Sequence, residues 1–143
     1  MDLIVTDATG KPVASHASYT LDLAFGSGEN DFDLQVEDAA LKAGSRIMID
    51  GTEYGGIIDD TDVGLSTVTW HGRDWHGVLA SKIIEPDRNN DYLTLSGTIP
   101  VIMRTLVSRA GLQGLFTVTE ESADHKTTCQ FRSEERRVGK ECR

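Results

Sequence analysis

The chain has 143 residues and a mass of 15.6 kDa, and its 38% hydrophobic and 26% charged residues exclude a wholly disordered chain. The formal net charge of −9 argues against general nucleic-acid binding, which depends on neutralising phosphates. The mean hydropathy is −0.28 and no apolar run approaches the roughly 20 residues of a membrane span. We therefore expect no nucleic-acid partner and no membrane insertion.

The first two thirds of the chain predicts antiparallel strands. Apolar and polar residues alternate over 18–25 and again over 31–37, which is typical of strands with one buried face. Asp50-Gly51 lies between two further apolar runs and favours a hairpin, because a type I′ turn needs positive φ at both central residues. The run 65–70 is rich in β-branched residues and predicts another strand, after a hairpin loop over 59–64.

Helices are predicted later in the chain. Residues 74–81 indicate a short helix with Asp74 as its cap, and 99–110 form an amphipathic pattern between Thr98 and Gly111, a cap and a terminator. Further strands are predicted over 116–119 and 127–131. The expected fold class is α+β, mostly β. A small antiparallel β-barrel or sandwich would occupy residues 1–85, and an incomplete α/β unit with the helix 99–110 would occupy residues 86–131.

The densest polar cluster is His71-Gly72-Arg73-Asp74-Trp75-His76. We interpret it as a structural junction in which Asp74 caps the helix and Trp70 and Trp75 anchor the core. The alternative is a metal-dependent enzyme or binding domain that uses His71, Asp74 and His76 as ligands. The five-residue spacing of the two histidines lacks the HExxH pattern of helical zinc sites, so the structural interpretation is preferred.

Other reactive residues assemble no catalytic set. Asp59, Asp60 and Asp62 match only part of a calcium-binding loop, and we interpret them as loop residues. Cys129 and Cys142 have no metal-type spacing. We therefore predict no catalytic, cofactor-binding or metal-binding residue, no cofactor and no enzymatic activity in this chain.

Three stretches resemble the N-terminal part of siphovirus tail-hub, or baseplate hub, proteins. They are residues 30–36, the pair 55–58 and 68–79, and the amphipathic stretch 97–110. The second stretch, residues 55–58 with 68–79, is similar to a Gly-Ile-Ile strand followed by a Gly-Arg-Asp junction that leads into a helix. The order and spacing of the three stretches carry the resemblance, because each motif alone is loose.

The resemblance implies a virion structural protein of the phage or prophage tail tip. Such a protein forms a ring, usually a trimer, and joins the end of the tail tube, or the distal tail protein, to the tip complex. It would be found in the virion and, during assembly, in the host cytoplasm. The resemblance also implies that any hydrolase activity lies in a C-terminal region outside this chain. A further alternative is a small carbohydrate-binding domain of the tail tip, which requires an exposed aromatic platform.

The last twelve residues, 132–143, differ abruptly in composition. They carry a charge of +2, whereas residues 1–131 carry −11. The string resembles the translation of a short-read sequencing adapter, so we expect an artefactual tail and a hub protein that continues beyond residue 131. An N-terminal fragment of this kind is expected to leave an open sheet edge and to aggregate.

Overall fold

The computed structural model describes residues 1–26, 28–37, 41–119 and 125–132. The fold is α+β and dominated by antiparallel strands, as the sequence predicts. The chain divides into two compact units, Met1–Ser81 and Lys82–Arg143, which we call the N-terminal unit and the C-terminal unit. The sequence analysis placed this boundary after residue 85. All but the first residue of the expected artefactual tail lie outside the described residues.

The N-terminal unit is built on one seven-stranded sheet in the order β2-β1-β5-β6-β7-β4-β3. Every neighbouring pair in this sheet is antiparallel. Its elements are β1 (Leu3–Thr6), β2 (Pro12–His16), β3 (Thr20–Phe25), β4 (Asn30–Gln35), β5 (Arg46–Ile49), β6 (Gly55–Val63), β7 (Val68–Asp74) and α1 (Trp75–Ala80). The alternation of residues 18–25 and 31–37 predicted β3 and β4, whereas β1 and β2 were not predicted individually.

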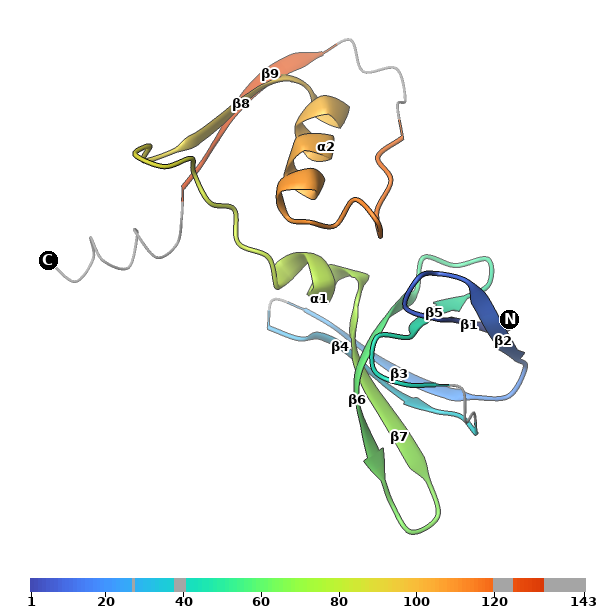
Figure 1. Cartoon of the computed structure of the whole chain (residues 1–143). Coiled ribbons are helices and arrows are strands. Elements are labelled where there is room, and N and C mark those ends of the chain that lie inside the picture. The colour runs from blue at the N-terminus through green and yellow to red at the C-terminus, as the bar shows by residue number, and fades with distance from the viewer. Residues whose placement is uncertain (27, 38–40, 120–124, 133–143) are drawn as a thin grey trace, which may run out of the picture. The chain divides into compact units, whose positions relative to one another are not determined.

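The sheet is strongly rolled but open (Figure 1). Its two edge strands, β2 and β3, are joined by residues 17–19 alone, a link that reaches at most about 14 Å. A flat sheet of this size would separate its edges by about 29 Å. The sheet must therefore curl to bring its edges together, and the Tyr19 hydroxyl donates a hydrogen bond to the Met1 carbonyl at 3.3 Å. The predicted barrel or sandwich is wrong in this respect, because one sheet forms and it does not close among the described residues.

Apolar side chains fill the inner face of the rolled sheet. The buried cluster takes residues from β1, β4, β5 and β6 and from the segment before β5, namely Leu3, Val5, Phe32, Leu34, Leu41, Ile47 and Ile58. Phe32 lies against Gly72 of β7, its direct cross-strand neighbour, and against Gly56 of β6. The missing side chains of these glycines make room for the aromatic ring at the centre of the unit.

Strand β6 contains a bulge in the stretch that the sequence analysis assigned to a loop. Ile58 is opposite Gly72 and Asp60 is opposite His71, so Asp59 is the extra residue. The predicted loop over 59–64 is therefore wrong: residues 59–63 belong to β6, and the turn lies over 64–67. The bulge directs the Asp59 carboxylate to the outer face, where it accepts two hydrogen bonds of 2.7 Å from Arg73 and raises the pKa of that guanidinium.

The turn between β1 and β2 is organised by Asp7. Its Oδ1 accepts hydrogen bonds from Thr9 Oγ1 at 2.6 Å, Thr9 N at 2.8 Å and Lys11 N at 3.0 Å, and these donors lower the pKa of Asp7 below 3.8. The ionised carboxylate therefore stabilises the folded turn above about pH 3.8, and this contribution is lost as the pH falls through the folded-state pKa.

We expect the substitution Thr9→Ala to raise the Asp7 pKa toward 3.8, because it removes the hydroxyl donor that lowers it most. A carbon-13 NMR titration of the Asp7 carboxyl measures the change. Thr52→Ala removes a threonine from a different turn and serves as the control. An Asp7 midpoint at or above 3.8 in the unsubstituted chain would contradict the hydrogen-bond assignment.

The C-terminal unit contains β8 (Leu93–Thr98), α2 (Ile99–Arg109) and β9 (Lys126–Phe131), with β8 and β9 antiparallel. The amphipathic pattern predicted α2, and Gly111 follows its end with a φ of +70°, as expected for a terminator. Thr98 occupies the N-cap position as expected, but its side chain makes no capping hydrogen bond. The predicted strand over 116–119 is wrong, because these residues form no strand. Neither helix of the described residues is long and apolar enough to cross a bilayer.

Candidate functional site

The three predicted anchor residues lie on β7 and at the start of α1. Asp74 is 2% exposed and is the N-cap of α1, and its Oδ1 accepts a 2.6 Å hydrogen bond from Gly77 N, as predicted for a cap. Trp70 lies on the inner face and packs against the apolar cluster. Trp75 is the first residue of α1, and its indole nitrogen lies beside Gly55.

The structure separates His71 from the other two residues of the alternative metal site, Asp74 and His76. Strand β7 continues to Asp74, so alternation places His71 on the outer face and Asp74 on the inner face. His71 Nδ1 lies 2.5 Å from Asp33 Oδ1, whereas His76 Nδ1 lies 3.8 Å from Asp74 Oδ2. No group of three or more His, Cys, Asp or Glu side chains in the described part of the chain is arranged to hold a metal ion.

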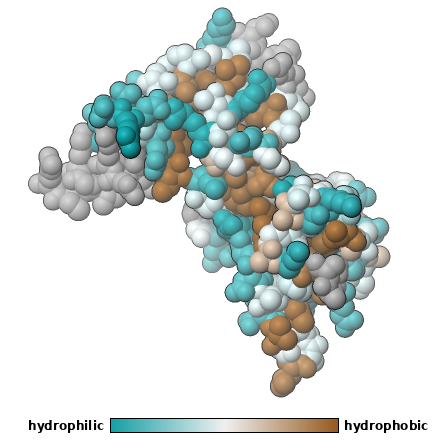
Figure 2. Space-filling view, in the orientation of Figure 1, coloured by the Kyte–Doolittle hydropathy of each residue, from teal (hydrophilic) through white to brown (hydrophobic). Residues whose placement is uncertain are grey.

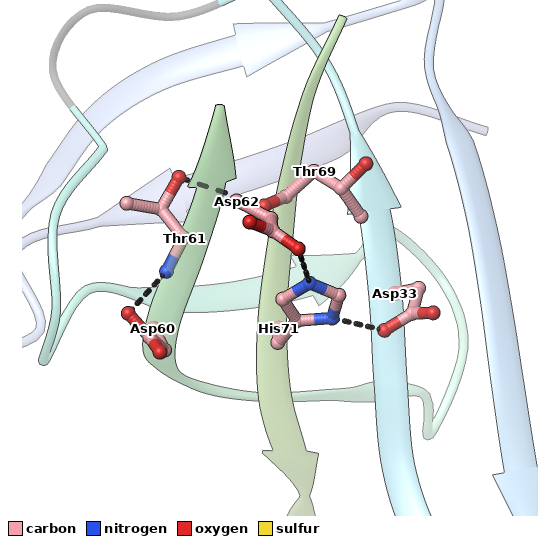
Figure 3. A network of polar contacts seen from close by, with 6 residues as sticks. All are labelled: Asp33, Asp60, Thr61, Asp62, Thr69 and His71. Carbon is pink, nitrogen blue, oxygen red and sulfur yellow. Dashed lines mark hydrogen bonds and ion pairs between the residues drawn. The ribbon is translucent and has the colours of Figure 1, made fainter. Parts of the chain in front are cut away.

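The outer face carries a polar row centred on His71 (Figure 3). Direct cross-strand neighbours place four side chains in line across four strands: Asp22, Asp33, His71 and Asp60. Asp62 approaches the other side of the imidazole, with its Oδ2 at 3.9 Å from Nε2. An open depression of about 370 Å³ lies over this row and is lined by residues that include Thr20, Gln35 and Thr69.

The sequence analysis paired no acidic residue of β4 with His71. The signal was available in the alternation of β3 and β4, which puts Asp22 and Asp33 on the wet face. Asp22 lies directly opposite Asp33, and like charges in this position destabilise a sheet. The contact of His71 with Asp33 offsets part of this repulsion. The row is exposed and acidic, with geometry suited to a charged contact surface.

Two exposed aromatic rings bear on the carbohydrate-binding alternative. Phe25 is 53% exposed and Tyr54 is 39% exposed, with ring centroids 5.7 Å apart. The two ring planes are inclined by 48°, so they do not form one flat platform on which a sugar ring would stack.

The comparisons with known proteins add no relative: the chain matches no protein-family model, no curated protein and no solved structure.

Proposed function

We propose that the chain is a structural component of a phage tail tip, a hub or baseplate protein that self-associates and joins the end of the tail tube to the tip complex. In this proposal it acts without catalysis, in the virion and, during assembly, in the host cytoplasm. Its partners are other copies of itself, as a trimer, and the tail tube or distal tail protein. Support comes from the sequence resemblance, whose three stretches fall on β4, on β6 with β7 and α1, and around α2.

The observation that carries the proposal is the apolar tip of the β6–β7 hairpin. Val63 is 74% exposed and Leu65 is fully exposed, on a turn closed by a hydrogen bond from Gly64 N to Thr67 O. Apolar surface gathers at this tip (Figure 2). An open groove of about 950 Å³ runs along the inner side of the hairpin, and its lining includes Tyr19, Val36 and Trp70. Exposed apolar side chains beside a groove favour a contact between copies, in which the tip of one copy enters the groove of the next.

The experiment is to measure the mass of the protein in solution by light scattering after gel filtration, and to look for rings by electron microscopy. We expect trimers, and we expect Val63→Asp with Leu65→Asp to yield monomers, because two buried charges would destabilise the contact. Met48→Asp changes an exposed apolar residue away from the hairpin tip and is the control. A protein that remains monomeric at high concentration, or a double variant that assembles like the control, would overturn the proposal.

A further inference from the structure

A small pocket lies where β7 passes into α1, within the N-terminal unit. Its lining includes four ring-bearing side chains: Phe25 at the end of β3, Tyr54 just before β6, and Trp75 and His76 in the first turn of α1. Two carboxylates, those of Glu53 and Asp74, also line it. The volume is about 10 Å³, which admits one group the size of a water molecule.

The rings form walls that face in different directions. Phe25 and His76 meet edge to face, with centroids 6.0 Å apart and planes at 83°, and Phe25 lies 5.7 Å from Tyr54. The faces of aromatic rings carry negative electrostatic potential, so a set of rings around a small space attracts a cation. The same rings remain partly open to solvent, which leaves a way into the pocket.

The second observation is a buried carboxylate oxygen. The Asp74 side chain is 3% exposed, and its Oδ1 is occupied by Gly77 N. Its Oδ2 has no hydrogen-bond donor among the described residues, and His76 Nδ1, at 3.8 Å, is beyond hydrogen-bond range. A buried carboxylate oxygen without a donor is costly, and the strongest remedy is a positively charged N–H donor. Asp74 Oδ1 already accepts the Gly77 N–H at the start of α1, so Oδ2 is the oxygen left to receive a donor.

We propose that this pocket binds a primary alkylammonium group, the chemistry of a lysine side-chain terminus or of a free amine. An ammonium group donates up to three hydrogen bonds, so it can satisfy Asp74 Oδ2 while the aromatic faces stabilise its charge. Glu53 supplies a second negative charge to the lining. The small volume excludes a quaternary ammonium, which is several times larger. The site does not depend on the tail-tip role and can be tested separately from it.

The test is an NMR titration of the whole chain with butylammonium chloride at constant ionic strength, followed by the indole N–H signal of Trp75 and the amide signal of Gly77. We expect a saturable shift with a Kd on the order of 1–10 mM, the range for a ligand of five heavy atoms. The Trp70 indole, which does not line this pocket, is the internal reference. Tetramethylammonium should give no saturable shift. If butylammonium gives none either, the pocket holds at most a water molecule and the proposal is overturned.

Matched variants locate the binding site. Asp74→Asn keeps an oxygen for the helix cap but removes the charge, and we expect it to weaken butylammonium binding at least tenfold. Asp33→Asn makes the same charge change on the outer face and should leave the Kd unchanged. Tyr54 lines the pocket, is half-exposed and lies outside any strand, so Tyr54→Leu should leave the fold intact. We expect it to weaken butylammonium binding several-fold, which keeps the test available if Asp74→Asn does not fold. Equal effects of Asp74→Asn and Asp33→Asn would refute the assignment.

A lysine-containing peptide separates the two sources of the ammonium group. Binding of Nα-acetyl-lysine methylamide at least tenfold tighter than butylammonium would point to a protein lysine as the natural occupant. Equal affinity would point to a free amine, and both results support the site.

Discussion

Replacing Phe32 with alanine is expected to destabilise the N-terminal unit by about 3–5 kcal/mol, the usual cost of deleting a buried aromatic side chain. Phe32 is 2% exposed and lies against two glycines, Gly56 and Gly72, which have no side chains that could close the space. The cavity would therefore persist, because the neighbouring backbone is held in the sheet by β6–β7 pairing. A loss of this size approaches the whole stability of a small unit.

Urea unfolding of the whole chain, followed by tryptophan fluorescence, measures this effect, since both tryptophans lie in the N-terminal unit. Phe25→Ala is the matched control, because it deletes the same atoms from the neighbouring strand at a half-exposed position. We expect the control to cost less than about 1.5 kcal/mol. Equal losses in the two variants would mean that Phe32 is not the centre of the core.

The parts of the fold that the sequence predicted are those set by local pattern. The alternation around Phe32 and Leu34 defined β4, and the spacing of apolar residues in 99–110 defined α2, because each pattern repeats within one element. The order of the strands in the sheet, by contrast, does not follow from any local pattern. Strand β1 pairs with β5, whose partner residues lie at least 40 positions later, and no local feature of Leu3–Thr6 selects that partner.

The polar row around His71 was missed for a related reason. Residues 59–63 contain three aspartates and no alternation, so they resemble a loop, although pairing with β7 holds them in a strand. Strand β7 was expected to end at Trp70. Since it continues to Asp74, His71 and Asp74 are an odd number of residues apart in one strand and face opposite sides. One misplaced strand end therefore grouped residues that the fold separates.

Gly72→Ala is expected to destabilise the N-terminal unit by about 3 kcal/mol, the upper range for overpacking a core. A Cβ atom at this position would overlap the carbonyl oxygen of Ile57 and the ring of Phe32. The carbonyl belongs to the central β6–β7 pair, so it cannot move without weakening the ladder. The cause is steric rather than conformational, since Gly72 does not have a positive φ.

The double variant Phe32→Ala with Gly72→Ala tests this explanation. Without the aromatic ring, one of the two overlaps disappears, so the added cost of Gly72→Ala should fall by at least about 0.5 kcal/mol, whereas independent sites would give additive costs. Gly28→Ala is the control, because a Cβ there meets no atom within 4 Å, and we expect it to change stability by less than about 0.5 kcal/mol. Strictly additive losses of unfolding free energy would show that the Ile57 carbonyl alone excludes a side chain at position 72. An unchanged urea midpoint for Gly72→Ala would show that strands β6 and β7 are not so closely spaced around Phe32.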